Sequence, residues 1–460
     1  MFKKSVFFGI ILTALSAVSS YGQTKFLGNW EGVLVAGPQK LKLIIHVTED
    51  STGYKGTLDS PDQGAFGIPL TSTEIKGDSL TVKNTGMGLT ISAAYMSGKD
   101  SLYSDFVQGG AKFKINWGRS TSVYKFNRPQ TPKPPFPYKS EEVVFVNKKA
   151  NDIKLAGTLT IPDNVKNPPA VILISGSGPQ DRDEKLMEHQ PFLVLADHLS
   201  RNGIAVLRYD DRGTAKSEGN FGGATSYDFS TDAEAALEFL RTRTDINISK
   251  IGLVGHSEGG MIAPMVASRN KNVNFIVLLA GPGITPDKLM LKQLEDYARG
   301  ANAPEAEIEK MLNVNRTVFT AMRESNDNVS VESKLKNELK EQNFANGNQD
   351  AINNFISSRL SPWFAYFIRF NPSEYLEKVE CPVLALNGDL DKQVNAEMNL
   401  EGIRQSLTKG GNKDFTIKSL EGLNHLFQEA KTGLESEYIQ IEQTMSPKVL
   451  EAVSEWIGKR

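Results

Sequence analysis

The chain of 460 residues is longer than a typical domain of roughly 100–200 residues, so we expect two or three folding units. Its hydrophobic fraction of 39% and charged fraction of 23% are those of a globular protein and exclude bulk disorder. The formal net charge of −2 argues against a nucleic acid or an acidic membrane surface as the main partner.

The first 22 residues have the layout of a secretory signal peptide. Lys3 and Lys4 form a short positive region, an apolar run covers residues 6–18, and small residues precede an expected cleavage site near Gly22. A membrane anchor is the alternative, but the run is shorter than the about 20 apolar residues of a spanning helix. No later segment is apolar enough to span, and no cysteine lies near the cleavage site for a lipid anchor. We therefore expect a secreted or periplasmic protein.

The cysteine content fits a core that is stable without covalent cross-links. Cys381 is the only cysteine, so no intramolecular disulfide can form. It precedes Pro382 at the start of an apolar strand pattern. We expect a buried structural thiol there.

Residues 23–127 have the pattern of an all-β domain. Residues 30–35, 41–47, 54–58 and 80–82 alternate or cluster strand-forming side chains, and Gly, Asp, Ser and Asn separate them at short intervals. This spacing predicts a small antiparallel barrel or sandwich. The proline-rich segment 128–139 that follows favours an extended chain, and we interpret it as a linker between domains.

Residues 140–460 alternate apolar strands with helical segments. The expected strands are 143–146, 156–161, 171–174, 204–209, 251–254, 275–279, 383–386 and 415–420, and the expected helices are 191–202, 229–241 and 259–269. Continuous apolar strands that alternate with helices indicate a mostly parallel sheet covered on both faces, as in an α/β fold. Residues 284–378 lack strand alternation and have helical periodicity, which predicts a helical cap, or lid, inserted at one edge of the sheet.

The strongest local motif is Gly-His-Ser-Glu-Gly-Gly at residues 255–260. It follows an expected strand and precedes an expected helix, which is the context of the G-x-S-x-G nucleophile elbow of α/β-hydrolases. The tight turn requires small residues around Ser257 and lifts its hydroxyl above the sheet at the positive end of the next helix. We predict that Ser257 is a catalytic nucleophile.

A nucleophilic serine needs a base that a third group orients, and in this fold the chain order is Ser, acid, His. His425 is the only histidine after Ser257, and it follows an expected strand. Asp389 and Asp391 both lie on the loop after strand 383–386. The spacing G-x-x-D-x-x-V, which is usual in these hydrolases, favours Asp391 as the acid, whereas Asp389 next to Gly388 suits a turn.

The tetrahedral intermediate of acyl transfer needs two oxyanion donors. One is expected to be the backbone N–H of Glu258, and the other the N–H of Ser177 or, as second choice, Gly178 on the loop after strand 171–174. Charged residues 210–217 are expected to brace this loop through residues 181–183. Trp363 and Phe364 belong to an aromatic stretch of the cap that either packs in a core or lines the substrate pocket with Gly178.

Four motifs together resemble bacterial α/β-hydrolase carboxylesterases of the EstD type. They are residues 176–183 (GSGPQDRD), 208–213 (RYDDRG), 255–260 (GHSEGG) and 382–388 (PVLALNG), and the resemblance covers about residues 138–460. It implies a Ser257–Asp391–His425 triad that hydrolyses short acyl esters. The sequence contains no zinc-ligand cluster, P-loop or dinucleotide-binding glycine motif, so we expect no cofactor.

Two other functions remain open at the level of sequence. The same machinery could serve an aminopeptidase or acyl-peptide hydrolase, with an acidic residue of the cap as the anchor for a peptide terminus. Alternatively, the β domain could bind a glycan or a lipid and carry the main function. The sequence leaves the natural substrate and the oligomeric state open.

Overall fold

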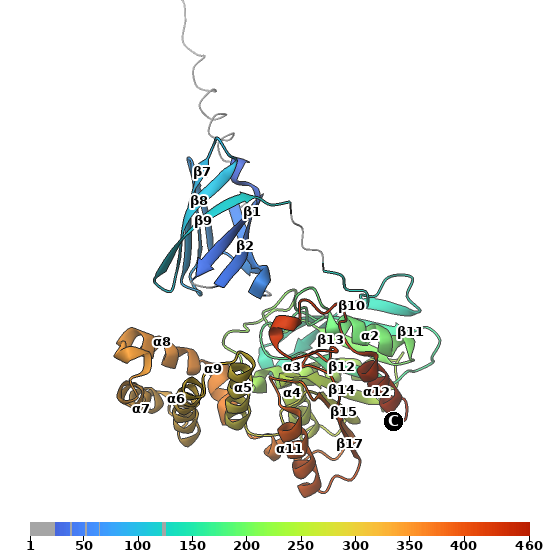
Figure 1. The fold of residues 1–460 in the computed structure, drawn as a ribbon. Coiled ribbons are helices and arrows are strands. Elements are labelled where there is room, and N and C mark those ends of the chain that lie inside the picture. The colour runs from blue at the N-terminus through green and yellow to red at the C-terminus, as the bar shows by residue number, and fades with distance from the viewer. Residues whose placement is uncertain (1–23, 37–38, 51–52, 64, 122–125) are drawn as a thin grey trace, which may run out of the picture. The chain divides into compact units, whose positions relative to one another are not determined.

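The computed structural model describes residues 24–460 except 37–38, 51–52, 64 and 122–125 (Figure 1). The chain divides into two compact units, Met1–Lys125 and Phe126–Arg460. The expected signal segment, residues 1–22, lies outside the described residues. In the described ranges no helix is long and apolar enough to cross a membrane.

The first unit is an antiparallel half-barrel, in agreement with the all-β expectation. Its described residues form one nine-stranded sheet with the order β4-β3-β2-β1-β9-β8-β7-β6-β5. The strands are β1 (Gly28–Ala36), β2 (Gln39–Asp50), β3 (Gly53–Ser60), β4 (Ala65–Pro69), β5 (Ser72–Lys76), β6 (Ser79–Asn84), β7 (Leu89–Met96), β8 (Ser101–Gln108) and β9 (Ala111–Arg119). Alternate residues of these strands face inward, as Leu89, Ile91 and Ala93 do on β7.

Two fully buried tryptophans fill the interior of the half-barrel. The indole N–H of Trp30 donates to the carbonyl of Phe26 at 2.8 Å, and that of Trp117 donates to the hydroxyl of Ser104 at 2.8 Å. A buried polar group without a partner would cost free energy, so these bonds allow both large side chains to pack inside. Both tryptophans therefore lie in the core of this unit with their indole N–H groups satisfied.

The proline-rich segment is attached to the second unit. The guanidinium of Arg128 donates to the carbonyl oxygens of Met187, Ile439 and Ile441 at 2.9, 2.9 and 3.0 Å. Gln130 exchanges hydrogen bonds with the backbone of residues 444 and 445. The segment that we expected to be a linker thus docks at its start onto the hydrolase-like unit.

The second unit is built on an eight-stranded sheet with the order β10-β11-β13-β12-β14-β15-β16-β17. The strands are β10 (Tyr138–Asn147), β11 (Ile153–Pro162), β12 (Ala170–Ile174), β13 (Ala205–Tyr209), β14 (Ile251–His256), β15 (Phe275–Leu279), β16 (Val383–Gly388) and β17 (Phe415–Leu420). β10, β11 and β13 pair antiparallel, and all other neighbours from β13 to β17 pair parallel. This is the mostly parallel sheet of the α/β-hydrolase fold that the sequence predicted.

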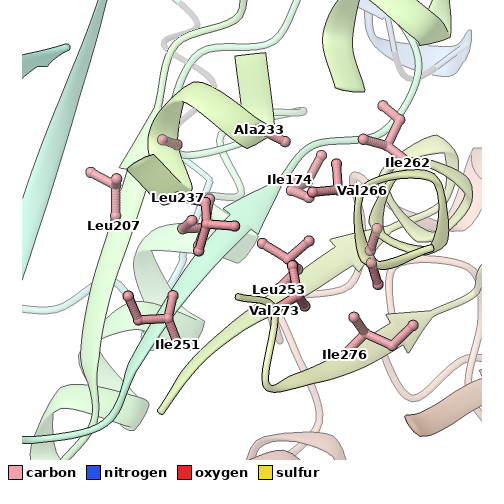
Figure 2. Close-up of a cluster of buried hydrophobic side chains, with 14 of the residues drawn as sticks. Ile174, Leu207, Ala233, Leu237, Ile251, Leu253, Ile262, Val266, Val273 and Ile276 are labelled. Atoms are coloured by element: carbon pink, nitrogen blue, oxygen red, sulfur yellow. The ribbon is translucent and has the colours of Figure 1, made fainter. Parts of the chain in front are cut away.

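Helices cover both faces of this sheet, because its central strands are apolar on both sides. α3 (Ser226–Arg241), α4 (Glu258–Ala267) and α11 (Ala396–Lys409) pack on one face, and α2 (Pro191–Arg201) and α12 (Pro447–Ile457) pack on the other. Figure 2 shows the first interface, where Leu253 and Ile276 of the sheet lie near Leu237 of α3 and Val266 of α4.

A helical cap lies between β15 and β16 in the chain and gathers at one side of the sheet (Figure 1). Its helices are α5 (Pro286–Gly300), α6 (Glu305–Glu324), α7 (Asn328–Glu341), α8 (Gln349–Arg359), α9 (Pro362–Arg369) and α10 (Ser373–Leu376). The cap has a hydrophobic core of its own, to which Met261 and Met265 of α4 contribute. The helix after the elbow therefore supports the cap directly.

Candidate active site

The residues of the elbow motif form a sharp turn between β14 and α4. Ser257 sits at the turn with φ 53° and ψ −116°, a backbone conformation that is strained for a residue other than glycine. Its N–H donates to the carbonyl of Leu279 at the end of β15, at 2.8 Å. The hydroxyl of Ser257 is thereby presented at the carboxyl ends of the parallel strands, where ligands of open α/β sheets bind.

Glycines around Ser257 allow this turn to pack against its neighbours. A Cβ on Gly255 would lie 2.0 Å from the carbonyl oxygen of Gly259, and a Cβ on Gly259 would lie 2.0 Å from the carbonyl oxygen of Ile174. A Cβ on Gly260 would lie 2.6 Å from the Cα of Gly281. Each of these contacts is with backbone atoms that cannot move independently, so glycine is required at all three positions.

The structure brings His425 and Asp391 together on the loops after β17 and β16. Nδ1 of His425 lies 2.8 Å from Oδ2 of Asp391, and the two side chains are 4% and 0% exposed. The other oxygen of Asp391 accepts the N–H groups of Gln393 and Val394 at 2.8 and 2.9 Å. A carboxylate held in this way orients the imidazole and can stabilise its charged form. Asp389 points elsewhere and accepts the N–H of Gly422 at 2.7 Å.

The loop after β12 lies against the nucleophile. A Cβ on Gly176 would lie 3.2 Å from the Cβ of Ser257. The N–H of Gly176 is already taken by Oε1 of Glu184 at 2.7 Å. In the described part of the chain, the N–H groups of Ser177 and Glu258 donate to no side chain and make no loop or cap bond. These two N–H groups are therefore free to serve as oxyanion donors.

The carboxyl group of Glu258 joins the elbow to three other elements. Its Oε1 accepts the hydroxyl of Ser226 at 2.6 Å and the indole N–H of Trp363 at 2.8 Å, and the side chain of Ser177 also hydrogen-bonds it. Burial raises the pKa of this carboxyl above its usual 4.5, and the hydrogen bonds offset only part of that effect. The bond from Trp363 ties α9 of the cap to the helix that begins after the nucleophile.

The other residues expected to bind substrate differ in their surroundings. Phe364 is 7% exposed and packs in the core of the cap, where its ring centroid lies 6.2 Å from that of Phe319. Gly178 adopts φ +95° on the loop after β12, a conformation that favours glycine. Trp363 therefore contacts the elbow through Glu258, whereas Phe364 packs inside the cap.

Charged side chains brace the loop after β12, as the motif at residues 210–217 suggested. Arg182 donates to both oxygens of Asp210 at 3.0 and 2.8 Å. Asp211 accepts the hydroxyl of Ser175 and the N–H of Gln180 at 2.8 and 3.0 Å, and burial raises its pKa to about 8. Arg212, by contrast, donates to both carboxylate oxygens of Asp232 and so ties the loop after β13 to α3.

Sequence reasoning missed a second histidine–carboxylate pair behind the elbow. Nδ1 of His256 lies 2.9 Å from Oε1 of Glu184, and Nε2 lies 3.0 Å from the carbonyl oxygen of His425. Because the two partners are 72 residues apart, no local spacing could have predicted the contact. Among the described residues there is no group of three or more His, Cys, Asp or Glu side chains that could hold a metal ion.

Comparisons with known proteins bear on the same region. A model of the Hydrolase_4 family, described as "Serine aminopeptidase, S33", matches residues 188–430, which is more than half of the chain and includes Ser257, Asp391 and His425. The esterase EstD of Thermotoga maritima is 26% identical over 309 residues. That alignment covers 66% of this chain and 66% of EstD, slightly less than two thirds of its length.

Solved structures that resemble the chain include two esterases. The Pyrococcus furiosus esterase Pf2001 is 15% identical with a TM-score of 0.43, over 74% of this chain and 98% of that chain. Est1E from Butyrivibrio proteoclasticus is 15% identical with a TM-score of 0.40, over 69% of this chain and 98% of that chain. The sheet topology, the elbow and the family match over residues 188–430 agree, and the chain belongs to the Hydrolase_4 family of α/β-hydrolases.

Proposed function

We propose that the protein is a serine carboxylesterase that hydrolyses short-chain acyl esters through Ser257, His425 and Asp391. The observation that carries the proposal is the strained Ser257 at the elbow, beside a loop with free N–H groups and near a buried His425–Asp391 pair at 2.8 Å. The similarity to EstD supports an ester as the scissile group.

In the proposed mechanism, His425 takes the proton of Ser257 as the serine oxygen attacks the ester carbonyl. The N–H groups of Glu258 and Ser177 stabilise the oxyanion of the tetrahedral intermediate. His425 then gives the proton to the leaving alcohol, which leaves an acyl-enzyme on Ser257. Water, deprotonated by His425, attacks this acyl-enzyme and releases the acid and the free serine.

Peptide hydrolysis is the second candidate, because the description of the matching family is that of a serine aminopeptidase. An aminopeptidase needs an ionised carboxylate that is open to the ammonium group of its substrate. Glu258, the carboxyl next to the nucleophile, is 3% exposed and already accepts the hydroxyl of Ser226 and the N–H of Trp363. Its raised pKa further favours the neutral form. These properties argue against Glu258 as that anchor and leave the acidic residues of the cap as its candidates.

The cap supports a preference for short acyl chains. The bond from Trp363 to Glu258 fastens α9 to the start of α4, so the cap bounds the space beside Ser257 on that side. We propose that this boundary leaves room for a short acyl chain and hinders a long one. We expect turnover to fall with chain length from acetate through butyrate to octanoate.

The test is hydrolysis of p-nitrophenyl acetate, butyrate and octanoate, with an aminoacyl p-nitroanilide alongside, by the wild type and Ser257→Ala. We expect ester turnover that falls by about 10⁴-fold or more in the variant. Ser249→Ala, at an exposed loop serine, is the control and keeps full activity. Preferred turnover of the anilide would move the function to peptide bonds. Ester turnover that survives Ser257→Ala would reject Ser257 as the nucleophile.

We also propose that the chain is exported, on the basis of the sequence of residues 1–22. The test is fractionation of cells that express the full chain, followed by N-terminal sequencing of the product. A product that begins near residue 23 outside the cytoplasm supports export. A cytoplasmic product that keeps residues 1–22 contradicts it.

A further inference from the structure

We propose that His256 and Glu184 form a positioning pair that shares a buried proton and holds the oxyanion loop and the base loop against the elbow. The inference rests on the proposed function, because it assigns the pair to the same site. Neither residue is placed to touch the substrate. Their effect on the reaction runs through Gly176, His425 and the neighbouring Ser257.

The two hydrogen bonds of the His256 ring need one more proton than a neutral imidazole beside an ionised carboxylate carries. The carbonyl oxygen of His425 can only accept, so Nε2 of His256 must carry a proton at 3.0 Å. Nδ1 faces Oε1 of Glu184 at 2.9 Å, and a neutral ring has no second proton for that contact. Either His256 is an imidazolium, or Glu184 is protonated on Oε1 and donates to Nδ1.

The surroundings favour the imidazolium form. Oε1 of Glu184 also accepts the N–H of Gly176 at 2.7 Å, and a protonated Oε1 that donated to Nδ1 would be a poorer acceptor for that N–H. Burial alone would lower the pKa of His256, but the carboxylate of Glu184 outweighs it and the pKa is raised. The other titratable groups that face the ring are His425, with ring centroids 4.9 Å apart, and Asp391.

The pair connects three segments that must keep a fixed geometry during acyl transfer. Glu184 holds the N–H of Gly176, which sets the position of the N–H of Ser177, the proposed oxyanion donor. His256 precedes Ser257 and at the same time binds the backbone of His425. Loss of the shared proton breaks one of these links, so the donor or the base moves relative to the nucleophile. Such a change weakens binding of the transition state more than binding of the ester.

The first measurement is ¹⁵N NMR of the full-length wild type with labelled histidine, over pH 6 to 9. The chain has five histidines, and His256→Asn identifies the signals of His256 by their loss. We expect both ring nitrogens of His256 to be protonated at pH 7, and to remain so above the pH at which an exposed histidine loses its proton. A His256 ring with one protonated nitrogen throughout the range, and no second proton in the contact with Glu184, overturns the proposal.

The second measurement uses Glu184→Gln, which keeps the shape of the side chain but removes the negative charge. The amide oxygen can still accept from Gly176, whereas a neutral His256 loses either that side chain or the carbonyl of His425 as a partner. We expect kcat for p-nitrophenyl acetate to fall by about tenfold to a hundredfold with KM unchanged, less than removal of an oxyanion donor costs. The NMR signals of His256 should change to those of a singly protonated ring.

Two controls separate the possible outcomes. Glu188→Gln changes an exposed carboxylate of the same loop, which pairs with Lys185 and interacts electrostatically with Arg128, and should match the wild type in kcat and in the His256 signals. The rate at which a fluorophosphonate labels Ser257 replaces kcat if no ester is hydrolysed, so failure of the proposed function is distinguished from failure of the pair. Wild-type labelling and kcat in Glu184→Gln would overturn the positioning role. If Glu184→Gln does not fold, His256→Asn is measured in the same way.

Discussion

The half-barrel and the hydrolase unit each contain a histidine bonded to an aspartate, and the two pairs differ in what the second ring nitrogen meets. On the barrel, Nε2 of His46 lies 2.6 Å from Oδ2 of Asp59, and its Nδ1 lies 2.8 Å from the amide oxygen of Asn29. In the hydrolase unit, Nδ1 of His425 lies 2.8 Å from Asp391. No protein group in the described residues binds the Nε2 of His425.

The comparison shows that a histidine–aspartate contact does not by itself mark a catalytic base. His46 uses both ring nitrogens to join strands β1, β2 and β3. His425 uses one nitrogen for its contact with Asp391, and in the proposed mechanism the other nitrogen takes the proton of Ser257.

The largest expected difference comes from neutralising the aspartate of each pair. Asp391→Asn should lower kcat for p-nitrophenyl acetate by about 10⁴-fold, because the amide no longer holds His425 in the tautomer that accepts a proton. Asp59→Asn makes the same change in the barrel and should leave kcat unaltered. Steady-state kinetics of both variants check this. Equal kcat in the two variants would contradict the different roles of the pairs.

The next difference concerns a tightly packed glycine in each unit. Gly259→Ala should destabilise the hydrolase unit by more than about 3 kcal/mol, because the new methyl group would lie 2.0 Å from the backbone of Ile174. Gly32→Ala in β1 should cost less, about 1–3 kcal/mol, because its methyl group would lie 2.6 and 2.9 Å from side-chain atoms of Ile115 and Trp117 and no closer than 3.0 Å to a backbone atom, the carbonyl oxygen of Asn116. Urea denaturation of each variant measures the loss, and a larger loss for Gly32→Ala would refute the steric explanation.

A smaller difference is expected from the tryptophan that donates to a polar side chain in each unit. Trp363→Phe removes the bond between α9 and Glu258 and should lower kcat/KM by about tenfold, since a buried acceptor loses a donor beside the nucleophile. Trp117→Phe removes the bond to Ser104 and should lower the stability by about 1–2 kcal/mol without a change in kcat/KM. An unchanged kcat/KM in Trp363→Phe would show that the bond between the cap and Glu258 does not affect the reaction.

The smallest expected effect is on the pH dependence of stability. The pKa of His256 is raised from 6.5, so the folded state holds its proton more tightly than the unfolded state does. The resulting stabilisation is fully present below pH 6.5 and is lost as pH rises through the folded pKa. The wild type should therefore lose stability relative to Glu184→Gln between pH 6 and 9, whereas Glu188→Gln should follow the wild type. Thermal unfolding across this range checks the sign, and a gap that widens with pH would contradict it.

Much of the second unit could be predicted from the sequence because its signals are local. The apolar runs of β12 to β16 are buried on both faces, so their composition alone indicates strands. The glycines around Ser257 indicate a tight turn in which a residue with a Cβ atom would clash. Sequence reasoning missed α11 and α12, and it missed β4, β5 and β7 to β9 in the barrel, where short alternating strands resemble loops. It predicted residues 128–139 as an extended linker but not the docking of Arg128, since the carbonyl partners of Arg128 lie in distant segments.

The sequence by itself determined the fold class, the elbow at Ser257 and, from chain order, the short set of candidates for base and acid. Steric requirements of a turn and periodic burial are properties of neighbouring residues, so they can be deduced without a structure. Only the tertiary structure decided that Asp391 and not Asp389 meets His425, that Phe364 packs inside the cap, and that Glu184 reaches His256. Each of those outcomes depends on which segments pack together in the folded chain. The local sequence around a residue does not show which distant residue it will contact.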